Sequence, residues 1–343
     1  MRFEIKTLTT ESVRCLCEHG LQKYDAEILV DSFVEADLCG VSTHGIRMLP
    51  SYIKKIDSKQ FFLEDISVLK STSAFTLINA NNSIGAISAL KASKIAVEKA
   101  KKSGLHVVFS RNSNTFGPAF YYTEYIAKQG MIGFACCNVP ASMPAFNGLE
   151  PMLGTNPLSF ACPSKSKGII IMDMATSIVA KSKFETARVN NEKLPLGWAL
   201  DKNGNPTTDP LEAIKGFILP MAGFKGYGIA MAIDIISGLL SGAGYLNRVN
   251  KFYSQNGECM NVGQLFVAID PSQVYDEDFY SDADKYIDIL RNSKVVEGKT
   301  IAIPGDDRNK ARRQNVESGI EISEADVVKL EEVFNKKLVR VIT

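Results

Sequence analysis

The sequence has 343 residues, of which 45% are hydrophobic and 22% are charged, a composition typical of a globular protein with a large core. Lysine and arginine (39) nearly balance aspartate and glutamate (38), so the chain lacks the basic surplus that nucleic-acid binding requires. No stretch reaches the roughly 18 apolar residues of a membrane span, and the N-terminus has no apolar signal-peptide core, which together predict a cytoplasmic protein.

Residues 1–72 have the apolar periodicity of helices. We expect a first helix that Thr10 caps and a second helix that runs from Asp25 to about Leu38. A third apolar stretch covers IRMLPSYIKKI and is expected to be interrupted by Pro50.

From residue 74 onward strands and helices alternate, which predicts an α/β core. Strands are expected over 74–80, 105–111, 131–138, 157–163, 168–174 and 263–270, and helices over 89–104, 120–130 and about 229–240. The stretch 323–338 has a Ser-x-x-Asp cap and helical periodicity, so we expect it to pack on the N-terminal helices. The predicted division is a helical lobe from 1–72 plus 308–343 and an α/β domain over 73–307.

The histidine and cysteine patterns limit the possible chemistry. The chain has three histidines, at 19, 44 and 106, and none has the i, i+4 spacing of a helical zinc site. Seven cysteines are an odd number and lie mostly in apolar stretches, which favours reduced thiols over a disulfide framework. We therefore expect no catalytic transition metal.

The usual nucleotide-binding motifs are missing from the sequence. No Gly-x-Gly-x-x-Gly follows a strand, and there is no Walker-type loop. Two other segments suit a cofactor. The strand ending at Asp173 leads into the small residues Ala175 and Thr176, whose backbone N–H groups can receive a phosphate or carboxamide. Lys225 lies among glycines in AGFKGYG, where it offers a compact cation.

Six segments in order resemble one known family: THG (43–45), RNSNTFGPAFYYTE (111–124), LGTNPLSFACP (153–163), MDMATS (172–177), PTTDP (206–210) and GFKGYG (223–228). They are similar to the malate/L-lactate dehydrogenases, a family that also includes ureidoglycolate, sulfolactate and diketogulonate oxidoreductases and cyclic imino acid reductases. The resemblance spans nearly the whole chain. It implies a non-Rossmann α/β fold and the NAD(P)-dependent interconversion of a 2-hydroxy acid and a 2-oxo acid, with NAD favoured, by a homodimer or larger assembly.

The resemblance also implies roles for particular residues. His44 matches the histidine that acts as general acid/base, and Thr43 matches the hydroxyl residue that assists it. Lys183 matches a charged active-site position that follows the cofactor strand. The implied cofactor-binding residues are Asp173, Met174, Ala175, Thr176, Lys225, Pro304, Gly305 and Asp306.

The chemistry of His44 supports its implied role. Oxidation of a secondary alcohol requires removal of the hydroxyl proton, and an imidazole can accept it near neutral pH. His44 lies in a loop bracketed by Gly40 and Gly45, which lets a short turn project polar side chains. The alternative is an ordinary capping or surface histidine, the interpretation that we would prefer without the resemblance.

Three groups of residues are further candidates for binding substrate. Arg47 follows His44 by three residues and can hold a carboxylate, although many relatives place that arginine one position later, where this chain has Met48. Thr155 and Asn156 form a turn that can bind a ligand or cap itself. Thr115 stands where many relatives have a histidine, and it can donate a hydrogen bond but cannot act as a base.

Other functions remain open at this point. The same scaffold can carry a reductase of a cyclic imino acid or a diketo sugar acid, or a ureidoglycolate dehydrogenase. A relative that binds the nucleotide without turnover is a further alternative, against which His44 argues. Lys183 can equally be a surface lysine within the charged stretch KSKFETARVNNEK.

Overall fold

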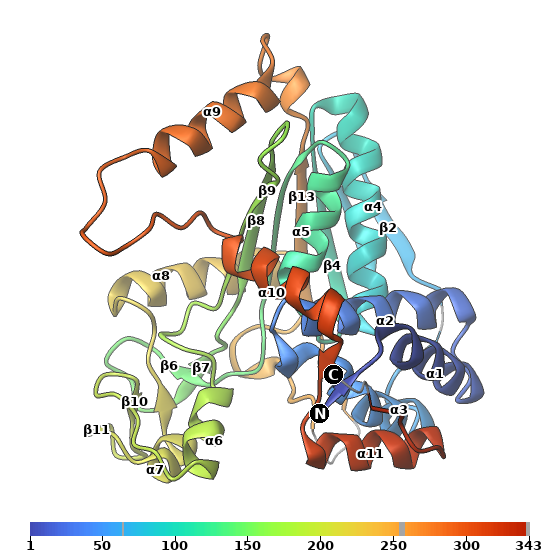
Figure 1. Cartoon of the computed structure of the whole chain (residues 1–343), viewed down its shortest axis with the longest axis vertical. Helices are drawn as coiled ribbons and strands as arrows, with labels where there is room; N and C mark the ends of the chain where they lie inside the picture. Colours follow the sequence, from blue (N-terminus) through green and yellow to red (C-terminus); the bar gives the residue numbers. More distant parts are fainter. Residues whose placement is uncertain (64, 254–257, 341–343) are drawn as a thin grey trace.

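A seven-stranded mixed sheet forms the centre of the computed structural model, which describes residues 1–63, 65–253 and 258–340 (Figure 1). The strand order is β2-β3-β4-β13-β5-β8-β9. Their bounds are β2 Ser67–Ser71, β3 Phe75–Asn79, β4 Leu105–Ser113, β5 Ile132–Cys137, β8 Leu158–Pro163, β9 Ile169–Met174 and β13 Val262–Ile269. Strands β3 and β4 run parallel because a helix connects them, and the other neighbouring strands pair antiparallel. The predicted α/β class is confirmed.

Helices cover the two faces of this sheet unequally. Helices α4 (Gly85–Ser103) and α5 (Ala119–Lys128) pack on one face, and their alanine-rich sides are buried against it. The opposite face meets α8 (Phe224–Ile233) and the π-helix η3 (Asp234–Leu239) that continues it. The sequence predicted this long apolar helix, but it begins at Phe224 and its second half is wound as a π-helix.

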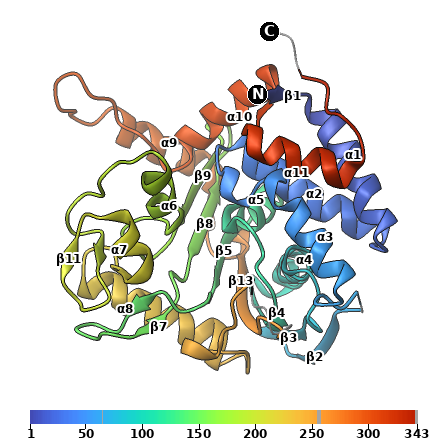
Figure 2. The ribbon, with the colours of Figure 1, turned by 90° about the horizontal axis from the view of Figure 1, so that it is seen from below.

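A helical lobe is built from both ends of the chain. It contains α1 (Ile5–Glu18), α2 (Lys23–Leu38), α3 (Leu49–Asp57) and α11 (Glu324–Phe334), which share one apolar core. Strand β1 (Arg2–Phe3) pairs with β14 (Ile320–Glu321), so the N-terminal and C-terminal segments lie side by side (Figures 1 and 2).

Helix α10 (Asp306–Ser318) crosses between the sheet and this lobe, so the predicted boundary at 307/308 falls inside its first turn. Arg312 of α10 forms ion pairs with Glu35 of α2 and with Glu124 of α5 at 2.5 and 2.8 Å. These contacts join the two parts of the molecule. The exact division of the chain into a lobe and a domain stays a prediction.

A small additional lobe lies on the far side of the sheet from the helical lobe (Figure 2). Its elements are β6 Met143–Pro144, β7 Pro151–Leu153, α6 Ser182–Val189, β10 Ala199–Leu200, β11 Pro206–Thr207, α7 Pro210–Lys215 and β12 Phe217–Ile218. Phe184, Leu194 and Ile218 are buried in its own apolar cluster. The sequence analysis did not anticipate this lobe, nor helix α9 (Phe279–Arg291).

Several predicted element boundaries were wrong. Thr10 lies inside α1, which begins at Ile5, and α2 begins at Lys23, two residues before Asp25. Pro50 does not interrupt a helix: it lies in the first turn of α3, where its missing N–H leaves no hydrogen bond unmade. The cap at Ser323 is confirmed, because its hydroxyl accepts a hydrogen bond from the Asp326 amide.

Candidate active site

Five strands bring their ends to one edge of the sheet. The antiparallel registers pair Ser113 at the end of β4 with Val262 at the start of β13, and Leu158 at the start of β8 with Met174 at the end of β9. Cys137 closes β5 at the same edge. Segments far apart in the sequence therefore converge here, as ligand sites at strand ends require.

The His44 loop covers this edge and encloses a cavity of about 320 Å³. Thr43, His44 and Thr115 supply polar groups to its lining, and Cys137 lies at the sheet end. Three residues predicted from two separate motifs are thus brought together around one space.

His44 has the properties of a proton-transfer group. It ends a short 3-10 turn, η1 (Ser42–His44), and is half-buried. The Oγ1 atom of Thr43 lies 2.9 Å from Nδ1 of His44, whereas Nε2 has no hydrogen bond to the described residues. Burial lowers the pKa of the His44 imidazole below its ordinary value. The ring is therefore neutral at pH 7 and able to accept a proton.

The rest of the cavity wall is mainly apolar and aromatic. Tyr52 of α3 packs against Phe33 and Phe252, with ring centroids 5.2 and 5.4 Å apart. The other wall residues are Met48, Gly117, Val139, Pro140, Tyr253, Met260 and Val262. Charges that develop beside such an apolar wall interact more strongly than in bulk water. Sequence reasoning missed these residues because no local pattern distinguishes an apolar residue of a cavity wall from one of the core.

Asp37 is a second residue that the sequence analysis missed. Its carboxylate accepts a hydrogen bond from the Ile46 amide at 2.7 Å, across the loop that carries His44. A Cβ atom at Gly45 would lie 1.8 Å from Asp37 Oδ1, so the loop approaches the carboxylate as closely as only glycine permits. Burial raises the pKa of Asp37 to about 7. The hydrogen bond from the Ile46 amide and the charge of Arg47 lower this pKa, but by less than burial raises it. An acidic residue at a helix C-terminus opposes the helix dipole, a signal that could have identified it.

Arg47 lies outside the cavity lining. Its side chain forms an ion pair with Asp326 of α11, with Nε 3.5 Å from Oδ2. Met48, the next residue, lines the cavity instead. Arg47 therefore links the His44 loop to α11.

Thr155 and Asn156 link the strand edge to neighbouring segments. The Asn156 side chain accepts from the Val139 amide at 3.1 Å and donates to the Ala230 carbonyl at 2.9 Å. The Thr155 carbonyl accepts from the Thr176 amide at 3.0 Å. Asn156 does not cap its own turn, and both ends of its amide are occupied by the backbone of other segments.

The predicted cofactor residues at the end of β9 lie next to the start of α5. The carboxylate of Asp173 accepts from the Phe120 amide at 3.0 Å, and burial raises the pKa of this carboxyl group. Met174 and Ala175 continue the chain as half-buried residues. The Thr176 hydroxyl is buried without a hydrogen-bond partner in the described residues.

The Pro304-Gly305-Asp306 turn lies against the same strand. The Pro304 carbonyl accepts from the Ile171 amide at 2.9 Å, and Gly305 has a φ of 106° at the start of α10. Arg308, one turn into α10, donates to the Asp173 carbonyl at 3.0 Å. A helix N-terminus beside a guanidinium group is suited to a phosphate. The structure thus brings two predicted cofactor segments together and adds Arg308.

The two predicted lysines are exposed. Lys183 lies in the first turn of α6 and Lys225 in the first turn of α8, and neither lines the His44 cavity. In the described part of the chain, no group of three or more His, Cys, Asp or Glu side chains is placed to hold a metal. Across the same residues, no helix is long and apolar enough to cross a bilayer.

A half-buried histidine beside a largely apolar cavity, at a place where several strands end, is the arrangement of an enzyme for small molecules. The family comparison makes this class specific. Residues 3–331 match the family model described as malate/L-lactate dehydrogenase. The chain belongs to this family, as its sequence motifs predicted, and it is a hydroxy-acid dehydrogenase that acts on a CH–OH group.

Individual relatives are similar over nearly their full lengths. The chain is 37% identical over 326 residues to a malate/(S)-sulfolactate dehydrogenase of Methanothermus fervidus, covering 94% of each chain. Its structure resembles the sulfolactate dehydrogenase of Methanocaldococcus jannaschii with a TM-score of 0.92, at 35% sequence identity and 98% coverage of both chains. The predicted non-Rossmann fold is thereby confirmed.

The names of two further relatives concern the cofactor. A ureidoglycolate dehydrogenase (NAD(+)) of Escherichia coli O157:H7 is 32% identical over 94% of this chain and 93% of its own length. A (2R)-3-sulfolactate dehydrogenase (NADP(+)) of Chromohalobacter salexigens is 28% identical over 95% of this chain and 96% of its own. Membership of the family implies a nicotinamide cofactor, and relatives named for each form exist. The cytoplasmic location stays a prediction.

Proposed function

We propose that this protein interconverts a 2-hydroxy acid of the malate, lactate or sulfolactate type and its 2-oxo acid, with His44 as general acid/base. The observation that carries the proposal is the position of His44, a half-buried imidazole on a cavity shared with Thr43 and Thr115. The cavity volume of about 320 Å³ is at the lower end of the range for small-molecule sites.

The proposed cofactor is a nicotinamide dinucleotide, with NAD favoured over NADP. The unpartnered Thr176 hydroxyl and the close Gly305 turn fit such a group. Asp173, Met174, Ala175 and Thr176 would hold it along the strand end, the Pro304-Gly305-Asp306 turn beside them, and Lys225 at a phosphate. When bound, it supplies the hydride acceptor or donor.

The chain's own residues then perform the proton transfer. In oxidation, His44 accepts the substrate hydroxyl proton at Nε2, because Nδ1 is engaged with Thr43. In reduction, the imidazolium returns that proton to the oxygen. Thr115 and Thr155 can donate hydrogen bonds to the substrate, and Asn156 fixes the turn that carries Thr155. Lys183 and Arg47 stay proposals for binding the carboxylate, which would require them to turn towards the cavity.

Turnover of a substrate panel tests this proposal. NADH and NADPH oxidation is measured with pyruvate, oxaloacetate, 2-oxoglutarate, sulfopyruvate, diketogulonate and cyclic imines, and ureidoglycolate is tested in the oxidative direction. Activity with an open-chain 2-oxo acid supports the main proposal. The ureidoglycolate dehydrogenase relative favours the principal alternative, which activity on ureidoglycolate alone would establish. Cofactor binding without turnover of any compound would instead support a non-catalytic relative.

The His44→Ala variant tests the role of this residue. Loss of a general acid/base lowers kcat by about 10²- to 10⁴-fold, and cofactor affinity should be unchanged. His19→Ala is the matched control, because His19 pairs with Asp57 at 2.6 Å and does not line the cavity. Full turnover by His44→Ala would reject the assignment.

We also propose that the protein forms a homodimer through α8 and η3. This continuous helix exposes Phe224, Ile235, Leu239 and Leu240, a large apolar surface for a monomer. A Leu239→Glu substitution should convert the dimer to a monomer in light-scattering measurements. Val328→Glu, at an exposed apolar position of α11, is the control and should leave the mass unchanged. A wild-type monomer would contradict the proposal.

A further inference from the structure

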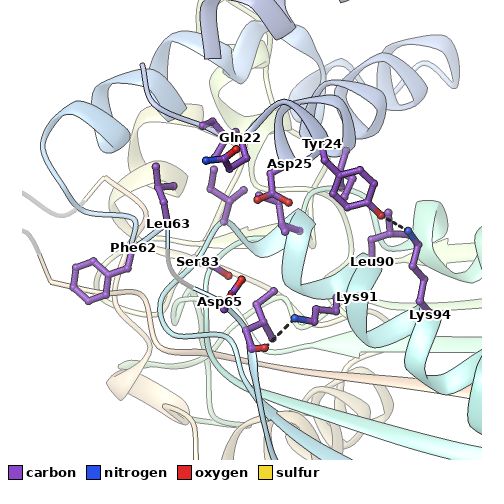
Figure 3. Close-up of a pocket in the computed structure, with 15 residues that line it drawn as sticks. Gln22, Tyr24, Asp25, Phe62, Leu63, Asp65, Ser83, Leu90, Lys91 and Lys94 are labelled. Carbon is purple, nitrogen blue, oxygen red and sulfur yellow. Dashed lines mark hydrogen bonds between the residues drawn. The ribbon is translucent and has the colours of Figure 1, made fainter. Parts of the chain in front are cut away.

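A second cavity, of about 430 Å³, lies at the other end of α2 from the His44 loop (Figure 3). The first two turns of α2 form one wall, and helix α4 forms another. Phe62, Leu63 and Asp65 border it from the chain between α3 and β2. None of its lining residues lines the His44 cavity.

The inner surface of this cavity is apolar. Ile28 of α2, Leu90 of α4 and Ile84 at the start of α4 line it, and all three are buried in the protein. Leu21 and Ile87 extend the same surface. Binding of a ligand with a short hydrocarbon chain would therefore be favoured, because its apolar area is removed from water.

Two polar groups in this cavity have no partner. The Ser83 side chain is 5% exposed, and its hydroxyl is buried without any hydrogen bond to the described residues. The Asp25 carboxylate likewise has neither an ion pair nor a hydrogen bond within the described part of the chain. In Figure 3 both side chains face the open space of the cavity. Unpaired polar groups in such surroundings are costly unless a ligand satisfies them.

The positive groups of the cavity, in contrast, are engaged. The Lys91 ammonium donates to the Ile66 carbonyl at 2.9 Å, and the Lys94 ammonium donates to the Tyr24 hydroxyl at 2.6 Å. Asp65 adds a second carboxylate to the lining. Both ammonium groups are thus held by neutral oxygens, and neither forms an ion pair with Asp25 among the described residues, so this carboxylate can pair with a cationic ligand.

Asp25, Asp65 and Ser83 supply too few oxygen ligands for calcium or magnesium, which require about six. They suit a primary ammonium group, which has three N–H donors. We propose that this cavity binds a small molecule carrying a primary ammonium on a short apolar chain. The ammonium pairs with Asp25 and donates to the Ser83 hydroxyl, and the chain lies against Ile28, Ile84 and Leu90.

The surroundings of Asp25 are consistent with this site. Burial raises the pKa of Asp25, the charge of Lys91 lowers it, and Asp65 raises it. A bound ammonium would stabilise the ionised form and form a charge-assisted hydrogen bond in a partly desolvated position. The site is independent of the proposed hydroxy-acid chemistry, because it shares no residue with that cavity.

A titration of the full chain with 3-methylbutylamine tests the site. Methyl-labelled isoleucine NMR would follow Ile28 and Ile84 in the cavity and Ile171 of β9 as a remote reference. We expect saturable shifts at Ile28 and Ile84 and none at Ile171. The neutral isostere 3-methylbutan-1-ol should bind at least about tenfold more weakly, because it lacks the charge that pairs with Asp25.

Variants separate the ionic contact from general apolar binding. Asp25→Asn keeps the shape of the side chain and should weaken amine binding by at least about tenfold. Ser83→Ala should weaken it by a smaller factor, since one neutral hydrogen bond is lost. Glu27→Gln is the control: this residue lies on the same helix outside the cavity lining and should leave binding unchanged. Equal binding of the amine and the alcohol, full affinity in Asp25→Asn, or no shifts at all would overturn the proposal.

Discussion

Helix α2 carries acidic residues in different situations at its two ends. Towards its C-terminus, Asp31 accepts from the Tyr121 hydroxyl at 2.6 Å, Glu35 pairs with Arg312 and Asp37 accepts from the Ile46 amide. At its N-terminus, Asp25 has no such partner among the described residues. The acidic residues at the C-terminal end thus have hydrogen-bond or ion-pair partners, and Asp37 among them holds the His44 loop. Asp25 at the N-terminal end is instead available to a ligand.

The largest expected effect is on stability, when the Arg312 guanidinium that pairs with Glu35 near the C-terminal end of α2 is removed. Arg312→Ala removes the guanidinium partner of Glu35 and of the buried Glu124, which keeps only its pair with Lys128 at 3.1 Å, and we expect a loss of about 3 kcal/mol in the free energy of unfolding. Urea denaturation measures it. Arg188→Ala is the matched control, since its pair with Glu185 is exposed and should be worth at most about 1 kcal/mol. Similar losses in both variants would show that the network adds no special stability.

Asp37 tests whether this end of α2 positions the His44 loop. In Asp37→Ala the buried Ile46 amide loses its acceptor, at a cost of about 1–3 kcal/mol. A displaced His44 should lower kcat by roughly tenfold to a hundredfold. Asp37→Asn keeps an oxygen acceptor and should stay within about threefold of the wild type. Steady-state kinetics with the substrate found in the panel test this role. Equal kcat values in the wild type, Asp37→Ala and Asp37→Asn would exclude a positioning role for Asp37.

The ionisation of Asp37 has a smaller effect on the free energy of unfolding, and this effect depends on pH. Its pKa is about 7 in the folded protein and about 3.9 in an unfolded chain, so the folded state retains this proton to higher pH. The stability that the group contributes is fully present below about pH 4 and is lost as pH rises through about 7. The unfolding free energy of the wild type minus that of Asp37→Asn should therefore fall between pH 4 and pH 7 and level off above pH 8. A difference that rises over this range in urea titrations would contradict the assignment.

The sequence predicted six of the seven sheet strands, because their apolar runs are bounded by turn residues, as in β9 and β13. It missed β2, which lies in the stretch predicted to be helical and whose residues are all exposed. It could not predict that β13 inserts between β4 and β5, because that pairing joins residues more than a hundred positions apart. The small lobe was missed since its strands are two or three residues long and leave no periodicity.

The sequence likewise predicted a part of the candidate site. His44, Thr43 and Thr115 lie on one cavity, as their motifs indicated. Arg47 was expected on the same helix face as His44, yet the two residues lie in two successive short 3-10 turns, and the Arg47 side chain pairs with Asp326. Long-range contacts such as this ion pair depend on where α11 packs, which no local pattern records.

The pairing of β1 with β14 has a consequence for synthesis. Domains usually fold during translation with the N-terminal part first. Here α1, α2 and α3 leave the ribosome early, but the apolar core that they share with Ile320, Leu330 and Phe334 is complete only after α11 has been made. The newly made N-terminal helices must therefore keep apolar surface uncovered while the whole sheet is translated, which makes them the segment that a chaperone has the longest time to bind.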